Sequence, residues 1–129
     1  MSNVRRPMPV VELEVICQSE TEFAKVAARP LADALGQAFG SAPGHTWVKL
    51  RYLSSQQYAE NETVVQASEL PVFVSVLDAH LPQSEALAGQ AKAITLAVAQ
   101  CLGRTPDCVH VQYAPAAAGR QAFGGTVVR

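Results

Sequence analysis

The chain has 129 residues, a length that suits one domain and is short for two. Apolar residues make up 49% of it and charged residues 16%, so a hydrophobic core can form and extensive disorder is excluded. Ten basic and eleven acidic side chains give a formal net charge of −1, and only 6% of the residues are aromatic. Because a nucleic-acid-binding surface needs clustered positive charge and stacking rings, we expect no nucleic-acid partner.

The cysteines and histidines form no disulfide or metal motif. Cys17, Cys101 and Cys108 are odd in number and lack C-x-x-C spacing, which favours a reducing compartment. The three histidines are scattered singly along the chain, so we predict no metal site.

The beginning of the chain does not have the pattern of a signal peptide. The apolar stretch after the basic N-terminus is interrupted by Glu12 and Glu14. No segment approaches the roughly 20 apolar residues of a membrane-spanning helix. We therefore expect a cytoplasmic protein with no membrane partner.

The first half of the chain predicts a strand, a helix and a second strand. Residues 10–16 alternate in the manner of a strand with one buried face. Ser19 is placed to cap a helix whose apolar positions recur at three- and four-residue steps as far as Phe39. Pro30 predicts a kink or a division into two short helices, because proline has no backbone N–H to donate. Residues 46–52 predict the second strand.

The second half repeats this pattern. After a polar, turn-like stretch at residues 54–69, the evenly apolar residues 71–77 predict a more central strand. Residues 87–102 predict a second amphipathic helix, and residues 108–113 a fourth strand. The C-terminal residues 119–128 predict a short hairpin or an arm.

The repeated pattern indicates an internal duplication of a β-α-β unit. Pro9 and Pro71 open corresponding strands 62 positions apart, and Val48 and Val109 correspond at a separation of 61. Because the crossover inside each unit is helical, its two strands are expected to be parallel and its connection right-handed.

The duplication predicts an α+β fold in which two helices cover one face of a four-stranded sheet. We expect a single domain over residues 1–129, with pseudo-repeats at about 9–64 and 71–129. The opposite sheet face is expected to carry Val11 or its neighbours, Trp47, Lys49, Arg51, and Phe73 or its neighbours. It is too apolar in part to stay exposed. We therefore expect oligomerisation to cover it.

At this point the residues resemble a known family. Residues 8–15 (MPVVELEV), followed by an acidic helix start, resemble the opening of the tautomerase superfamily, whose short members are single β-α-β units that begin Met-Pro. Residues 70–74 (LPVFV) and 104–111 (RTPDCVHV) resemble the family again, and residues 123–125 (FGG) are similar to part of its C-terminal hairpin. The resemblance covers residues 8–129 as a fused two-unit member. It implies a homotrimer with active sites at the start of a first strand.

The resemblance also implies a chemistry and a catalytic residue. In this family a free N-terminal proline is the general base or acid, which assigns that role to Pro9. A free α-amine titrates at about 8, and a partly desolvated, cation-lined pocket lowers its pKa. Such an amine moves protons between the carbons of an enol at neutral pH, while cationic side chains hold the substrate carboxylate. The family requires no cofactor and no metal.

The sequence departs from the family pattern at two places. Eight residues precede Pro9, so its nitrogen is an amide without a basic lone pair. Either translation begins at Met8 and removal of that methionine exposes Pro9, or the extension is real and proline chemistry is lost or replaced. Pro71 is internal in both cases and suits a strand opening. The family's arginine after the first strand is also unmatched, since Ser19 occupies that neighbourhood.

Three other residues are candidates for substrate contact. Lys49 and Arg51 stand two apart on a predicted strand, so they share one face and form a candidate carboxylate clamp. A solvated or subunit-bridging pair is the alternative. Tyr58 follows that strand, about where the family has an aromatic beside the proline, and is either a pocket wall or a plain loop residue.

These observations leave three hypotheses. The first is a tautomerase or isomerase that catalyses keto-enol proton transfer on a small carboxylate-bearing substrate, provided that Pro9 is exposed as the N-terminus. The second is a catalytically inactive protein of the same fold with a structural or interaction role. The third is a ferredoxin-like binding domain, which uses the same elements in a different sheet order.

Overall fold

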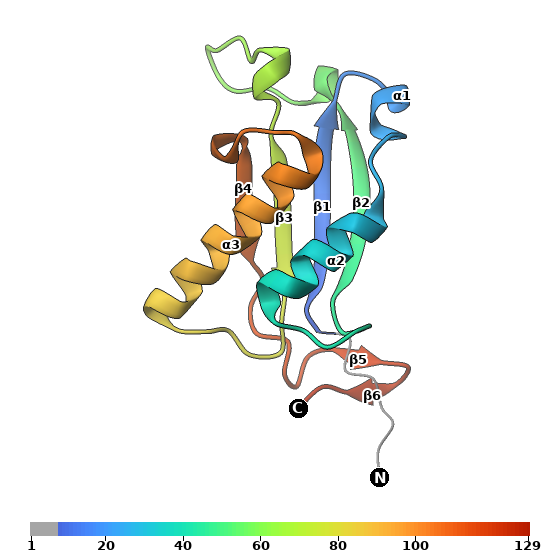
Figure 1. Cartoon of the computed structure of the whole chain (residues 1–129), viewed down its shortest axis with the longest axis vertical. Helices are drawn as coiled ribbons and strands as arrows, with labels where there is room; N and C mark the ends of the chain where they lie inside the picture. The colour runs from blue at the N-terminus through green and yellow to red at the C-terminus, as the bar shows by residue number, and fades with distance from the viewer. Residues whose placement is uncertain (1–7) are drawn as a thin grey trace.

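The computed structural model of the protein describes residues 8–129. Its helices and strands follow the two halves of the chain in the predicted order (Figure 1). They are β1 (Val10–Cys17), α1 (Glu20–Phe23), α2 (Ala28–Phe39), β2 (Trp47–Ser54), β3 (Val72–Leu77), α3 (Ser84–Leu102), β4 (Val109–Tyr113), β5 (Ala122–Phe123) and β6 (Thr126–Val127).

The four long strands form one mixed sheet in the order β2-β1-β3-β4. β1 is parallel to β2 and β3 is parallel to β4, while β1 and β3 are antiparallel neighbours at the centre. The helices α2 and α3 lie together over one face of the sheet (Figure 1). The predicted α+β fold with a duplicated β-α-β unit is confirmed. This strand order also excludes the ferredoxin-like arrangement.

The first helical segment is divided into α1 and α2, as the presence of Pro30 in the sequence predicted. Ser19 caps α1, because its Oγ accepts a hydrogen bond from the backbone N–H of Glu22 at 3.1 Å. Pro30 is the third residue of α2 and lies in its first turn, where a missing N–H costs no intrahelical hydrogen bond. Gly40 ends α2 in the left-handed region at φ 66°, which glycine adopts without a steric penalty.

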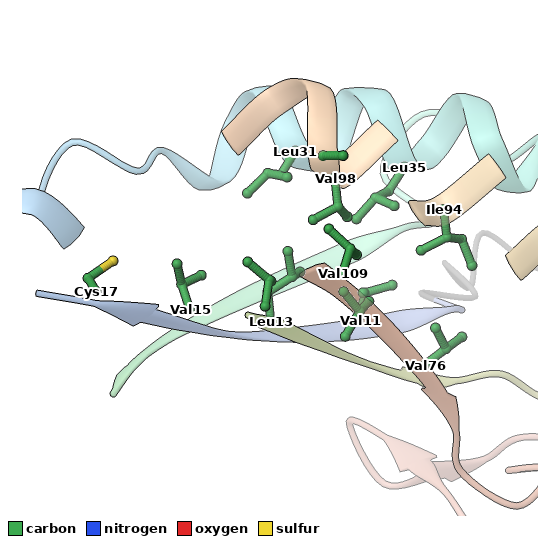
Figure 2. Close-up of a cluster of buried hydrophobic side chains, with 13 residues drawn as sticks. Val11, Leu13, Val15, Cys17, Leu31, Leu35, Val76, Ile94, Val98 and Val109 are labelled. Carbon is green, nitrogen blue, oxygen red and sulfur yellow. The ribbon is translucent and has the colours of Figure 1, made fainter. Parts of the chain in front are cut away.

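The core lies between the sheet and the two long helices (Figure 2). Alternate residues of β1 and β3 point toward the helices and are almost fully buried, as the period of two in a strand requires. α2 and α3 pack their apolar stripes on these residues. The largest fully buried side chains are Leu13, Ile16, Leu31, Leu35, Ile94, Val11, Val15, Val72, Val74, Val76 and Val98.

Within residues 8–129, the other face of the sheet carries no helix, and it is more polar than the sequence predicted. Val11 points into the core, and its neighbours Glu12 and Glu14 occupy the open face instead. The apolar part of this face includes Trp47, which is 40% exposed, and the half-buried ring of Phe73. Over residues 8–129, none of the helices combines the length and the apolar character that a membrane span requires.

Candidate active site at the start of β1

Pro9 is buried immediately before the first residue of β1. Its carbonyl oxygen accepts a hydrogen bond from the backbone N–H of Trp47 at 3.0 Å, which ties the starts of β1 and β2 together. The ring of Trp47 meets Phe123 edge to face, with ring centroids 5.4 Å apart. The C-terminal β5–β6 hairpin therefore lies at the end of the sheet where β1 begins (Figure 1).

The nitrogen of Pro9 is joined to Met8 by a peptide bond. An amide nitrogen shares its lone pair with the carbonyl group and does not take up a proton at neutral pH. With this bond intact, Pro9 is a structural residue at the head of β1.

The two candidate clamp residues share one face, as predicted, and both contact the same carboxylate. Lys49 Nζ lies 3.5 Å and Arg51 Nη2 3.4 Å from Glu12 Oε2. Their side chains are 66% and 63% exposed, so water screens these ion pairs and each is weak. Glu12 therefore holds the two cations only weakly, and both remain largely exposed to solvent.

A hollow of about 330 Å³ lies on the open sheet face next to this ion-paired group. Among the described residues that line this hollow, Arg51 is the only cation, and Glu12 and Glu14 are the two acidic residues. The lining residues are Glu12, Glu14, Arg51, Phe73, Ser75 and Gln112. By itself this hollow suits a polar ligand better than a free carboxylate, because the two acidic side chains repel a second anion.

A single chain does not close a pocket between Pro9 and the clamp. In the β1–β2 strand register, Lys49 lies opposite Glu12 and Arg51 lies opposite Glu14. These two glutamates are three and five residues beyond Pro9 on β1. At about 3.3 Å per residue the cations are displaced from Pro9 by about 10 and 17 Å along the strand.

Tyr58 lies at the opposite end of β1 from Pro9. Ser54, the last residue of β2, pairs with Cys17, the last residue of β1, and Tyr58 follows beyond that end. Its ring centroid is 5.9 Å from that of Phe73, and its hydroxyl donates a hydrogen bond to Glu60 Oε2 at 2.7 Å. Within one chain Tyr58 is therefore not beside Pro9.

The hydrogen bond to Glu60 is expected to dominate the titration of Tyr58. This bond, with smaller effects of burial and of the Glu60 charge, raises the pKa of Tyr58 to about 12. Because the folded pKa exceeds the unfolded value of 10.0, the stabilisation is present below pH 10 and is lost as the pH rises through about 12. Ultraviolet titration of the phenolate, assigned with Tyr58→Phe, measures this shift.

Glu60→Gln is expected to return the Tyr58 pKa toward 10, since the charged acceptor is gone. Glu62→Gln, at an exposed position two residues further along, is the matched control and should leave the titration unchanged. An unaltered Tyr58 pKa in Glu60→Gln contradicts this assignment.

Sequence reasoning missed the acidic residue that follows β3. Val10 pairs with Leu77 in the antiparallel β1–β3 register, so Pro9 and Asp78 are the next residues beyond that pair. Burial raises the pKa of Asp78 above its usual value, against the opposing effects of the Ala79 backbone N–H and of His80. The signal was present in the sequence as a carboxyl group that directly follows an apolar strand.

Arg104 was also missed, and its role is structural. Its Nη1 donates to the carbonyl oxygen of Leu70 at 2.7 Å, and its Nη2 donates to that of Ile16 at 2.9 Å. The guanidinium thereby joins the end of β1 to the start of β3. Burial raises the pKa of the adjacent Cys17 thiol, although the Arg104 charge opposes this.

Within residues 8–129, no group of three or more His, Cys, Asp and Glu side chains is arranged to bind a metal ion. The three cysteines are unpaired. His110 stacks its ring at a tilt on Phe73, with centroids 5.5 Å apart, on the open face of the sheet.

Comparison with known proteins gives structural matches only. Neither a family model nor a curated protein matches the sequence. A fused 4-OT wild-type symmetric trimer is 16% identical, with 92% of this chain and 94% of that chain covered and a TM-score of 0.68. Malonate semialdehyde decarboxylase is 17% identical, with 89% and 90% covered and a TM-score of 0.60. N1, a member of the cis-3-chloroacrylic acid dehalogenase family, is 15% identical, with 92% and 82% covered and a TM-score of 0.64.

The matches extend over nearly the whole chain and over both β-α-β units. The chain therefore has the fold of the tautomerase superfamily in its fused two-repeat form, as the resemblance of its sequence predicted. At these identities the similarity establishes the fold, and the activity has to be argued from the site.

Proposed function

We propose that this protein is a tautomerase that catalyses keto-enol proton transfer on a small carboxylate-bearing substrate. The observation that carries the proposal is the position of Pro9, buried at the head of β1 and next to the docked C-terminal hairpin, in this fold. Where the mature chain begins at Pro9, this residue is a secondary amine with a reference pKa of about 8, and its buried position lowers that pKa. The amine then accepts a proton from one substrate atom and returns it to another.

We further propose that the protein acts as a homotrimer. The similar fused 4-OT is a symmetric trimer, and the open sheet face of this chain lacks a partner within residues 8–129. In such an assembly a neighbouring chain supplies Lys49 and Arg51 as the carboxylate clamp and Tyr58 as a pocket wall for each Pro9. The assembly thereby brings together residues that one chain keeps apart.

The test compares two forms of the chain with phenylenolpyruvate as the probe. A chain that begins at Pro9 is expected to catalyse ketonisation about 10²-fold faster than a chain that retains Met8, because only the former has a basic nitrogen. Intact mass spectrometry verifies each N-terminus, and light scattering measures the oligomeric state. Equal rates for the two forms contradict the catalytic role of Pro9.

A non-catalytic scaffold is the second candidate function. It is favoured by the peptide bond at Pro9 and by Ser19, which stands near the position where the family has an arginine. A trimer that is inactive in both forms supports this alternative.

The unpaired cysteines suit a reducing compartment, and we propose the cytoplasm as the location of the protein.

A further inference from the structure

We infer that Asp78 is a proton-transferring residue at the start of β1, and that it acts even when the Met8–Pro9 peptide bond is intact. This inference rests on the proposed reaction class, keto-enol isomerisation, and not on a free Pro9 amine. It gives the full chain a basic group at the position where the amide of Pro9 has none.

The sheet register places Asp78 beside Pro9 on the helix-facing side. Val11 pairs with Val76, and both are fully buried against the helices (Figure 2). Pro9 lies two residues before Val11, and Asp78 lies two residues after Val76. Because side chains alternate along a strand, both extend from the same face of the sheet as this buried pair. Tyr113, which pairs with Val76 on β4, belongs to the same row.

One oxygen of Asp78 is available to a ligand. Oδ1 accepts a hydrogen bond from the backbone N–H of Ala79 at 2.8 Å, which fixes the orientation of the carboxyl group. Oδ2 accepts no hydrogen bond from the part of the chain that the structure describes. Since no fully buried side-chain oxygen in that part lacks a partner, Oδ2 is not fully buried. The Tyr113 hydroxyl donates to Gln90 Oε1 on α3 at 3.0 Å, so it does not occupy this oxygen.

The surroundings of Asp78 favour a carboxyl group that exchanges protons. Burial raises its pKa above the usual 3.8, and the nearby charge of His80 lowers it only in part. Burial and the charge of Asp78 in turn raise the pKa of Tyr113, which stays a neutral phenol at neutral pH. Within residues 8–129, His80 on the following loop is the titratable group that acts on Asp78, and Tyr113 on β4 is the one on which Asp78 acts. A more basic carboxylate removes protons more readily.

The proposed step uses one proton and one carboxyl group. The Asp78 carboxylate takes the hydroxyl proton of the enol, and the O–H bond electrons form the carbonyl bond. The electron pair of the carbon–carbon double bond then takes the same proton from the Asp78 carboxylic acid. The product is the keto acid, and Asp78 is a carboxylate again, so no oxidant, metal or cofactor takes part.

The experiment measures phenylenolpyruvate ketonisation by the full chain with the Met8–Pro9 bond verified by mass. The full chain is expected to exceed the uncatalysed rate by about 10²-fold, and Asp78→Asn to remove that excess. The wild-type rate should fall at acid pH with an apparent pKa above 3.8. Any residual rate of Asp78→Asn should lack this acid limb, whereas a merely structural role leaves the limb in place at a reduced rate.

Asp33→Asn, at an exposed position on α2, is the matched control and should keep the wild-type rate. Asp78→Asn retains an acceptor for the Ala79 N–H, and circular dichroism verifies its fold. Asp78→Ser, which also keeps an acceptor, is measured in parallel. A full chain that is inactive, or an Asp78→Asn rate within threefold of wild type, overturns the inference. If either outcome is found and the form beginning at Pro9 is active, the proposed tautomerase function stands without a catalytic role for Asp78.

Discussion

Arg104→Met is expected to lower the free energy of unfolding by about 3 kcal/mol. The guanidinium donates one hydrogen bond to Leu70 and one to Ile16, and hydrogen bonds to a charged group contribute about 1.5–3 kcal/mol each. Methionine fills a similar volume but leaves two partly buried carbonyl oxygens without this donor. Urea denaturation monitored by circular dichroism measures the loss.

Arg120→Met is the matched control, because Arg120 is exposed and donates no side-chain hydrogen bond within residues 8–129. It should change the free energy of unfolding by less than about 0.5 kcal/mol. Equal losses in the two variants contradict the structural role assigned to Arg104.

Leu35→Ala is expected to cost about 3–4 kcal/mol of stability. Leu35 is fully buried on the face of α2 that packs against the sheet (Figure 2), and truncation there leaves a cavity that the close-packed core fills only in part. Thermal or urea unfolding of the variant gives the change in free energy.

Leu96→Ala removes the same atoms from α3 at a position that is 48% exposed. Its expected cost is below about 1 kcal/mol, because little apolar surface is returned to water. A loss in Leu96→Ala as large as that in Leu35→Ala indicates that another surface, such as a subunit interface, buries Leu96.

Local patterns in the sequence predicted the elements and their duplication. Alternation and helical periodicity depend on neighbouring residues, so the strands, the amphipathic helices and the division near Pro30 were visible without a structure. Ser19 was recognised as a helix cap for the same reason, since capping acts within one turn. The resemblance of residues 8–15 to a family opening led to the correct fold.

Only the tertiary structure decided which residues meet across strands. The β1–β3 register places Asp78 beside Pro9, although the two are far apart in sequence, and the β1–β2 register places Tyr58 at the opposite end. The sharing of Glu12 by Lys49 and Arg51 and the bonds of Arg104 also arise from strand pairing and packing. Residue spacing determines the face on which a side chain lies, whereas its partners depend on long-range pairing, which no local pattern encodes.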